Sequence, residues 1–269
     1  MFDTNKLPKT ISDRIAGLKW HCDDVGKSGS TILLFDEMVL KIEKPNRSSE
    51  HERLLLGWLD GKLPSLKTPK IIEAETRDGY SFLLMSRLPG EMACSEDNLR
   101  NIEDTVKALA NGLKMLWRVN ISDCPCSNAI SEKLVQAKHN MENNLIDTSD
   151  FNPETFTTEG FTDVRDLYEY LDQNRPNEDL IFSHGDFCLP NVFVSGCETT
   201  GFLDWGNGGV ADRWQDIALC VRSFRHNYMD FAGYGENEYR KYKSLLFQEL
   251  GIESDEEKIR YFILLDEFF

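Results

Sequence analysis

The sequence predicts an α+β fold with two lobes: a small N-terminal lobe with an antiparallel β-sheet and one main helix, and a larger, mostly helical C-terminal lobe. Length is one reason, because 269 residues exceed the ~100 to 150 of a usual domain. The other is a change of pattern at Arg87–Gly90, where short apolar runs broken by turns give way to long helical periodicities. We therefore expect the lobes at residues 1–88 and 89–269.

Four short apolar runs in the first lobe predict two antiparallel strand pairs. The pairs are Thr31–Phe35 with Met38–Ile42, and Ile71–Ile72 with Tyr80–Met85. Between the pairs, Ser49 and Glu52 have the spacing of a capping box, and apolar residues follow at helical spacing. A helix is therefore expected to begin near Ser49.

In the second lobe, apolar residues at i, i+3, i+4 and i+7 predict helices with one buried face. These cover Glu96–Val119, Ser131–Leu145 and Asp163–Leu171, and the chain from Asp212 onward is also expected to be mainly helical. Short strands are expected at Leu180–Phe182, Asn191–Val194 and Gly201–Leu203.

The composition, 41% hydrophobic and 28% charged, is that of a globular protein, and the formal net charge is −16. Such a charge repels the phosphates of nucleic acids and anionic membranes, whereas it attracts cations. We therefore expect no nucleic acid or membrane partner, and a polycationic small molecule would suit the charge. The same charge also keeps an ordinary protein dispersed in solution, and this interpretation stays open.

The cysteine content favours a reducing compartment. Seven cysteines are an odd number, and no basic-then-apolar signal sequence follows Met1. No apolar run approaches the ~20 residues of a membrane span. We expect a cytoplasmic protein, a monomer or weak dimer, without a zinc site at Cys124-Pro125-Cys126, whose spacing does not suit one.

Two loops in the second lobe carry the strongest chemical signal. Asp186 and Asn191 lie in the first, and Asp204 opens the second, one strand later. Each of these residues alone often only caps a turn. Short strands that flank both loops can bring the three side chains to one mouth, so the ordered set favours a shared function.

The residue types in this set suit phosphoryl transfer. An amide at Asn191 and a carboxylate at Asp204 offer the oxygen ligands that Mg²⁺ prefers. Asp186 then remains available to accept the proton of a hydroxyl. A carboxylate that orients the nucleophile beside metal-bound phosphate is what this reaction requires. His184 is expected to hold its loop by hydrogen bonds rather than to titrate.

His184-Gly185-Asp186 with Asn191, followed by Asp204-Trp205-Gly206, resembles the catalytic and metal-binding loops of the aminoglycoside phosphotransferases, distant relatives of the protein kinases. The resemblance covers nearly the whole chain and implies a bilobal protein-kinase-like fold. It assigns Asp186 as the catalytic carboxylate and Asn191 and Asp204 as the Mg²⁺ ligands, in agreement with the roles that the chemistry suggests.

Three further stretches resemble the 3′-phosphotransferase branch of that family: Trp58–Pro64, Gly209–Ala218 and Leu264–Phe269. They imply transfer of the γ-phosphate of a nucleoside triphosphate to the 3′-hydroxyl of an aminoglycoside antibiotic such as kanamycin, and hence antibiotic resistance. ATP is the expected donor and GTP remains possible, because backbone groups near Met85 and Arg87, which any residue can supply, would recognise the base.

The first lobe offers a nucleotide site. A lysine that projects from a strand reaches the phosphates when a helical glutamate fixes its ammonium, and the resemblance assigns Lys41 and Glu52 to this pair. The loop Gly26–Ser30, with Gly26, Ser28 and Ser30, is a weaker candidate to cover the triphosphate through its backbone amides. It is not a P-loop, because His21 stands where the earlier glycine would be.

The acceptor site is expected to be acidic, since aminoglycosides carry several ammonium groups that carboxylates can bind. The resemblance assigns six residues to it: Asp150, Glu154, Arg222, Asp266, Glu267 and Phe269, the last through its terminal carboxylate. Trp205, Asn207 and the pair His226-Asn227 depart from the usual pattern, which leaves the antibiotic spectrum open.

Two alternatives stay open. One is a kinase of another small hydroxylated amine, such as choline, or of another antibiotic class. The other is a pseudokinase that binds nucleotide without turnover. The complete set of candidate catalytic residues argues against the pseudokinase. A protein kinase is disfavoured because no A-P-E-like element follows Asp204.

Overall fold

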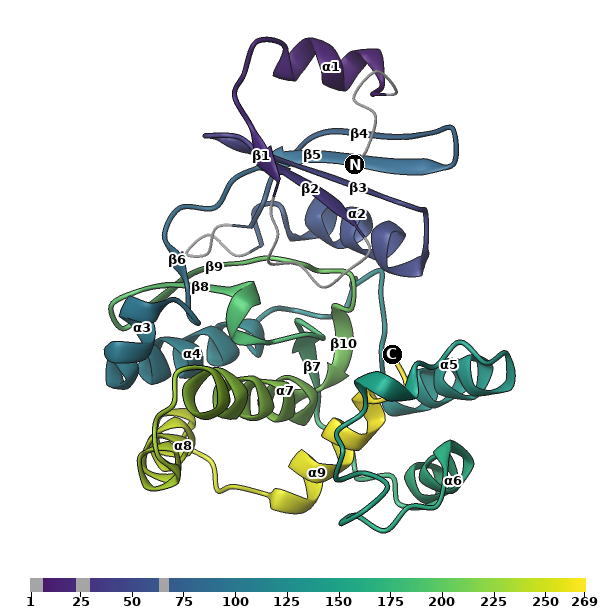
Figure 1. Cartoon of the computed structure of the whole chain (residues 1–269), viewed down its shortest axis with the longest axis vertical. Helices are drawn as coiled ribbons and strands as arrows, with labels where there is room; N and C mark the ends of the chain where they lie inside the picture. The colour runs from purple at the N-terminus through teal and green to yellow at the C-terminus, as the bar shows by residue number, and fades with distance from the viewer. Residues whose placement is uncertain (1–6, 23–29, 63–67) are drawn as a thin grey trace.

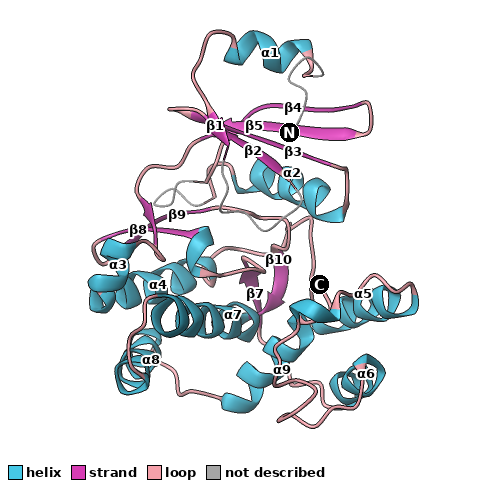
Figure 2. Cartoon of the chain, viewed as in Figure 1, coloured by secondary structure: helices cyan, strands magenta, loops and turns pink. Residues whose placement is uncertain are grey.

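The computed structural model describes residues 7–22, 30–62 and 68–269. A small lobe with a β-sheet lies above a larger, mainly helical lobe (Figures 1 and 2), as predicted. Gly26, Ser28 and the residues Leu63 and Pro64 of the Trp58–Pro64 stretch lie outside the described residues. None of the helices that the structure describes is both long and apolar enough to cross a membrane.

The small lobe contains a five-stranded antiparallel sheet of order β1-β2-β3-β5-β4. Its strands are β1 (His21–Cys22), β2 (Thr31–Leu34), β3 (Met38–Glu43), β4 (Ile71–Arg77) and β5 (Tyr80–Ser86). Both predicted strand pairs are confirmed, although β4 extends five residues beyond Ile72. Two short elements escaped prediction, β1 and the helix α1 (Lys9–Ile15).

The two faces of this sheet pack differently because side chains alternate along each strand. Leu40 and Ile42 of β3 join a small core with Ile11 of α1 on one face. Lys41, between them in the sequence, therefore projects from the opposite face, the one that α2 (Arg47–Leu59) covers (Figure 1). Leu55 and Leu56 of α2 belong to a second core cluster that joins Leu83 and Met85 of β5 to the buried side chains of the large lobe. Helix α2 thus packs against both lobes.

Helix α2 begins earlier than predicted. Asn46 is its N-cap: the side chain of Asn46 accepts a hydrogen bond from Ser49 N, and Ser49 Oγ accepts one from Asn46 N. The expected capping box of Ser49 with Glu52 is therefore wrong, because Ser49 occupies the N3 position rather than the N-cap. The correction matters, since Glu52 lies one turn inside the helix with its carboxylate available to the sheet.

The large lobe is built of helices around two small sheets. Its α-helices are α3 (Glu96–Arg100), α4 (Ile102–Leu116), α5 (Ile130–Glu142), α6 (Val164–Gln173), α7 (Arg213–Arg225), α8 (Glu236–Leu250) and α9 (Glu256–Asp266). The single helix expected over Glu96–Val119 is in fact α3 and α4. Asn101 separates them with φ −98° and ψ 44°, outside the helical region.

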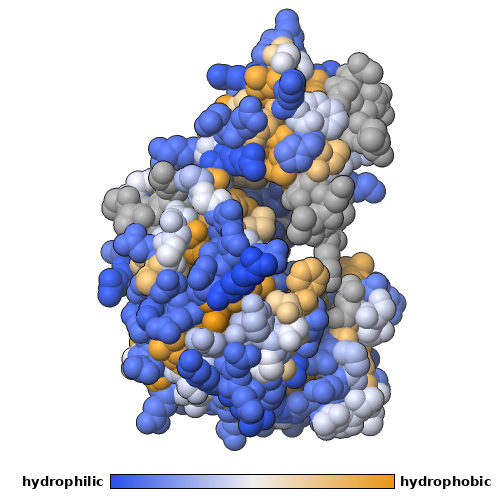
Figure 3. Space-filling view, turned by 60° about the vertical axis from the view of Figure 1, so that its left-hand side comes forward, coloured by the Kyte–Doolittle hydropathy of each residue, from blue (hydrophilic) through white to orange (hydrophobic). Residues whose placement is uncertain are grey.

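Short strands of the large lobe carry the loops that were predicted to be functional. Strand β8 (Val192–Ser195) pairs with β6 (Glu91–Met92) and β9 (Glu198–Phe202), and β7 (Leu180–Ser183) pairs with β10 (Gly209–Asp212). The three predicted strands are confirmed, whereas β6 and β10 were not predicted. Figure 3 shows the narrow upper lobe on the broader lower lobe, with mostly hydrophilic side chains on this face.

We predict that Asn46→Ala lowers the free energy of unfolding by about 1 kcal/mol, because α2 loses its N-terminal cap. For a chain of this size the melting temperature should fall by about 2 to 4 °C, as measured by thermal denaturation followed by circular dichroism. Asn46→Asp keeps an acceptor at the N-cap and should melt close to the wild type. An equal loss in both variants would contradict the capping role.

Candidate active site

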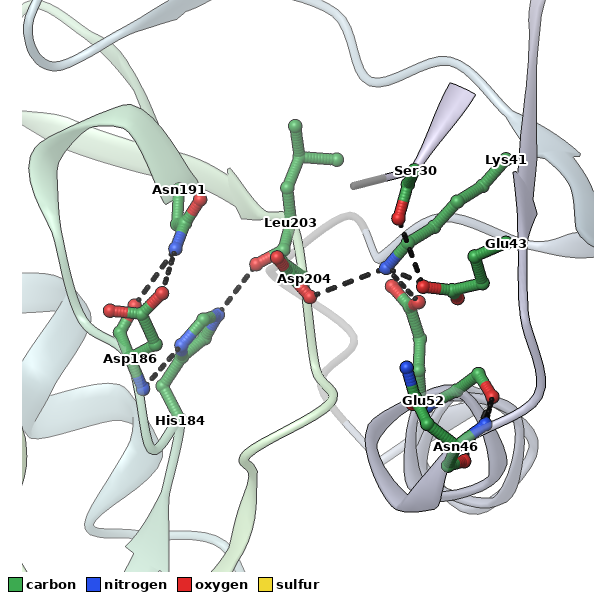
Figure 4. A network of polar contacts seen from close by, with 11 residues as sticks. Ser30, Lys41, Glu43, Asn46, Glu52, His184, Asp186, Asn191, Leu203 and Asp204 are labelled. Atoms are coloured by element: carbon green, nitrogen blue, oxygen red, sulfur yellow. Dashed lines mark hydrogen bonds and ion pairs between the residues drawn. The ribbon is translucent and has the colours of Figure 1, made fainter. Parts of the chain in front are cut away.

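On the sheet side of the cleft, Lys41 and Glu52 form a buried ion pair. The Nζ atom of Lys41 lies 2.8 Å from Glu52 Oε2, and the side chains are 11% and 2% exposed. The alternation of β3 sends Lys41 toward α2, and the capped start of α2 places Glu52 opposite it (Figure 4). The pair predicted from sequence is therefore formed in the structure.

Two more carboxylates surround the same ammonium. Glu43 Oε1 and Asp204 Oδ1 each lie 3.6 Å from Lys41 Nζ. Burial lowers the pKa of Lys41, but the carboxylates of Glu52, Asp204 and Glu43 together raise it by more, so Lys41 stays charged. Burial raises the pKa of Glu52, and the Lys41 ammonium opposes this rise. The three carboxylates thus hold the Lys41 ammonium as a fixed positive charge in an acidic environment.

Across the cleft, Asp186 and Asn191 contact each other directly. The Asn191 side-chain Nδ2 donates to Asp186 Oδ2 at 2.8 Å and to the Asp186 carbonyl at 3.1 Å. Asp186 lies in the loop after β7, and Asn191 closes a single 3-10 turn over Leu189–Asn191. Burial, followed by the charge of nearby Asp186, raises the pKa of the Cys188 thiol. The contacts with Asn191 fix the orientation of the Asp186 carboxylate.

The backbone of Leu203 holds the two loops together. Its N–H donates to the Asn191 carbonyl at 2.8 Å, and its carbonyl lies 2.8 Å from His184 Nε2. The next residue, Asp204, has φ 59°, an uncommon value for a residue other than glycine. Figure 4 shows its carboxylate between the Asp186 loop and Lys41. His184 makes the hydrogen bonds expected of a loop-holding residue.

Asp216 supports the Asp186 loop from below, a role that sequence reasoning missed. Its two carboxylate oxygens accept the N–H groups of His184 and Gly185 at 2.8 and 2.9 Å, and its side chain is fully buried. Burial raises the pKa of Asp216 despite these hydrogen bonds and nearby His184. Asp216 lies on α7, far along the chain, so local sequence pattern gives no signal for the contact.

Two glycines allow the loops to approach closely. Gly185 has φ +81°, and a Cβ atom there would lie 1.7 Å from the carbonyl oxygen of Asn207. At Gly206 a Cβ atom would lie 1.9 Å from Ser48 Oγ on α2. Backbone cannot yield as a side-chain tip can, so Gly185 is the stricter requirement.

Trp205, one of the departures from the family pattern, is fully buried beneath the site. Its ring lies 4.6 Å from the His184 ring and 5.8 Å from the Phe182 ring, measured between centroids. Large buried aromatic side chains contribute much of the packing energy of a core. Trp205 thus packs under the loop of Asp186. Asn207 is exposed and accepts a hydrogen bond from Asn128 through its carbonyl.

The residues at the loop mouth fit a magnesium ion. Asn191 turns its amide nitrogen toward Asp186, which leaves the Oδ1 atom for a cation. Asp204 is 46% exposed on its side chain and its carboxylate faces the cleft. An amide oxygen and a carboxylate, with room for water or phosphate oxygens, are a donor set that Mg²⁺ accepts.

Four of the six residues assigned to the acceptor site lie at the end of α9 or beside it. Arg222 Nη2 on α7 contacts Asp266 Oδ2 at 2.6 Å. Burial lowers the pKa of Arg222, but the charge and hydrogen bond of Asp266, with the nearby Cys188 and Asp186, together raise it above its usual range. Glu267 accepts the N–H of Asn152 at 3.1 Å, so it connects the loop that contains Asn152 to the end of α9. Phe269 is about half exposed.

The other two residues assigned to the acceptor site, Asp150 and Glu154, lie in the chain segment between α5 and α6. Asp150 ends the 3-10 turn Thr148–Asp150, and Glu154 is exposed in the loop that follows. On the nucleotide side, Ser30 Oγ donates to Glu43 at 3.0 Å. Met85 is buried in β5. The Arg87 N–H donates to the Glu37 carbonyl, so this backbone donor is already used within the protein.

Comparison with known proteins bears on this geometry. A protein of Enterococcus faecalis named aminoglycoside 3′-phosphotransferase is 40% identical to this chain over 222 residues. The alignment covers 82% of this chain and 78% of the relative. A second aminoglycoside 3′-phosphotransferase, from Escherichia coli, is 30% identical over 279 residues, covering 98% and 95%.

Solved structures agree in fold. The crystal structure of an aminoglycoside 3′-phosphotransferase of type VIII superposes with a TM-score of 0.80 at 26% identity, over 96% of both chains. The aminoglycoside phosphotransferase APH(3″)-Id from Streptomyces rimosus has a TM-score of 0.82 at 20% identity, over 100% and 99% of the chains, and shows the fold alone.

Fold and site together define a phosphotransferase with a protein-kinase-like architecture. A family model described as "Phosphotransferase enzyme family" matches residues 24–245. The chain belongs to this family, and within it to the aminoglycoside 3′-phosphotransferases.

We predict that Asp216→Asn lowers kcat about 100-fold while nucleotide binding changes little. The amide replaces one acceptor oxygen with a donor that faces a backbone N–H, so the Asp186 loop shifts, and a shift of about 1 Å can cost that factor. Steady-state kinetics and calorimetry measure the two quantities. Asp230→Asn, at an exposed aspartate, is the control. Wild-type kcat in Asp216→Asn would contradict the positioning role.

Proposed function

We propose that the protein transfers the γ-phosphoryl group of a nucleoside triphosphate, ATP in the first instance, to the 3′-hydroxyl of an aminoglycoside antibiotic and so confers resistance. The observation that carries the proposal is the arrangement of two groups across one cleft. Lys41, fixed by Glu52, faces Asp204, and Asp204 is tied through Leu203 to Asp186 and Asn191 (Figure 4).

Lys41 is proposed to hold the phosphates of the donor. Its charge is fixed by Glu52 at 2.8 Å, so little conformational freedom is lost when an anion arrives. Residues 1–88 would then form the nucleotide-binding lobe. Gly26, Ser28 and Ser30 are proposed to cover the triphosphate, and backbone groups at Met85 and Arg87 to contact the base, a mode that also admits GTP.

Asp186 is proposed to orient the acceptor hydroxyl and receive its proton. One oxygen of its carboxylate already accepts from Asn191, which leaves the other to face a hydroxyl. In phosphoryl transfer the transition state is loose, so positioning contributes more than proton removal. The hydrogen bonds of Asn191 to the carboxylate and carbonyl of Asp186 supply that positioning.

Asn191 and Asp204 are proposed to hold Mg²⁺, which when bound would neutralise charge on the phosphate oxygens. The same two residues also join their loops to each other through Leu203 and to β3 through Lys41. Asp204 lies 3.6 Å from Lys41 Nζ, so its carboxylate would serve both the ammonium and the ion.

The acceptor is proposed to bind in the large lobe, residues 89–269, beside Asp150, Glu154, Arg222, Asp266, Glu267 and Phe269. The relatives at 30 to 40% identity are named for aminoglycosides. A net charge of −16 favours the approach of a polycation. Arg222 holds Asp266 and Asn152 binds Glu267, so the carboxylates of α9 are fixed in position.

The proposal predicts that purified protein with Mg²⁺ and ATP phosphorylates kanamycin. A coupled assay of nucleotide hydrolysis measures turnover, mass spectrometry shows one added phosphate, and NMR locates it at the 3′-oxygen. Choline serves as a competing acceptor in the same assay. Phosphorylation of choline with none of kanamycin would reassign the acceptor, and nucleotide binding without any product would favour a pseudokinase.

We predict that Asp186→Ala lowers kcat by about 10²-fold or more, since a positioned carboxylate contributes on that scale, while the affinity for Mg²⁺-nucleotide changes little. Rapid-quench kinetics and calorimetry report the two effects separately. Asp230→Ala removes an exposed carboxylate of the large lobe and is the matched control. Near-normal turnover in Asp186→Ala would refute the assigned role.

A further inference from the structure

Lys133 is a buried lysine that the proposed reaction does not use. It lies on the inner face of α5 with Ile130, Leu134 and Ala137, and the residue is 8% exposed. Lysine is seldom buried in this way unless it is paired. On the same helix, Lys138 is exposed and lies 3.9 Å from Glu142, as surface lysines commonly do.

The surroundings of the Lys133 ammonium are unusual for a lysine. Among the side chains that the structure describes, none forms a hydrogen bond or ion pair with its Nζ atom. Its close neighbour is an aromatic ring instead, since Nζ lies 4.6 Å from the centroid of the Phe269 ring. A cation over a ring face is attracted by the ring quadrupole. The ring has no lone pair, however, so it cannot replace the hydrogen-bond acceptors that the three N–H groups of an ammonium require.

Lys133 also lies close to the acceptor side of the site. Asn140, two turns further along α5, donates to the Phe268 carbonyl at 2.9 Å and so fixes α5 to the segment after α9. Burial lowers the pKa of Lys133, and the charges of Asp266 and Asp186 act in the opposite direction. Lys133 therefore lies within electrostatic range of the proposed catalytic and acceptor carboxylates.

The side chain of Lys133 is largely buried, but its Nζ atom is not among the fully buried side-chain nitrogens without a partner in the described chain, so solvent or a ligand can reach the ammonium. Its three N–H donors need lone pairs, and near the acceptor site an incoming ligand can supply them. Hydroxyl and ether oxygens have such lone pairs. An ammonium group of the acceptor has none and would be repelled by the like charge.

We propose that Lys133 is a specificity-determining residue that donates a hydrogen bond to an uncharged oxygen of the acceptor and disfavours acceptors with an amine at that position. The proposal rests on the proposed function and deepens it. The carboxylates of the site attract the ammonium groups of the acceptor in general. Lys133 instead favours a hydroxyl over an amine at one position of the acceptor.

The test compares Lys133→Met with the wild type on acceptor pairs that differ by one hydroxyl or amine, paromomycin with neomycin and kanamycin A with kanamycin B. In one of the pairs, Lys133→Met should lower the ratio of kcat/KM for the hydroxyl acceptor to that for the amine acceptor by about 10-fold or more, the loss expected for one hydrogen bond from a charged donor. The KM for nucleotide should not change.

Lys138→Met, on the exposed face of the same helix, is the matched control and should leave both ratios unchanged. The melting temperature gives a second measurement: Lys133→Met should melt at or above the wild-type temperature, because an apolar side chain suits the inner face of α5 beside Ile130 and Leu134. Lys133→Arg keeps the charge and should retain the preference for the hydroxyl acceptor.

Equal losses of kcat/KM with both members of each pair, or a lower melting temperature of Lys133→Met, would overturn the proposal in favour of a structural role. Wild-type ratios in Lys133→Met would overturn it as well. These outcomes differ from failure of the proposed function, which would appear as absence of aminoglycoside phosphorylation by the wild-type protein itself.

Discussion

The arrangement of the cleft depends on the buried contact between Lys41 and Glu52. The two residues come from different elements, β3 and α2, and α2 in turn packs into the core of the large lobe. Removing one member of a buried ion pair typically destabilises a protein by about 3 to 5 kcal/mol, because the other charge remains buried without a partner. The pair therefore fixes both the charge that faces the cleft and the position of the sheet relative to α2.

Opposite this pair, backbone hydrogen bonds rather than side-chain packing alone define the catalytic loops. Leu203 joins the loop of Asp186 to the loop of Asp204, and Asp216 receives two consecutive N–H groups from beneath. Ser223 on α7 adds a third support, since its Oγ accepts the Leu189 N–H at 2.9 Å. Buried polar groups that are fully hydrogen-bonded hold one conformation. Helix α7 thus acts as the rigid base of the site.

Sequence reasoning predicted the parts of this structure that depend on local pattern. The strand pairs of the small lobe follow from alternating apolar runs, and the set of Asp186, Asn191 and Asp204 follows from residue type and strand context. It failed where contacts are long-range or where two local signals compete. Asn46, not Ser49, caps α2. Asn101 separates two helices although the apolar periodicity continues across it. Asp216 accepts hydrogen bonds from residues that lie 31 and 32 positions away in the sequence. No short window of sequence contains such a contact.

The double packing of α2 has a mechanical consequence. Leu55 and Leu56 share one apolar cluster with Leu83 and Met85 of β5 and with the core of the large lobe. Wide separation of the lobes would therefore expose apolar side chains of α2 to water, which is unfavourable. The contacts of α2 thus oppose wide opening of the cleft.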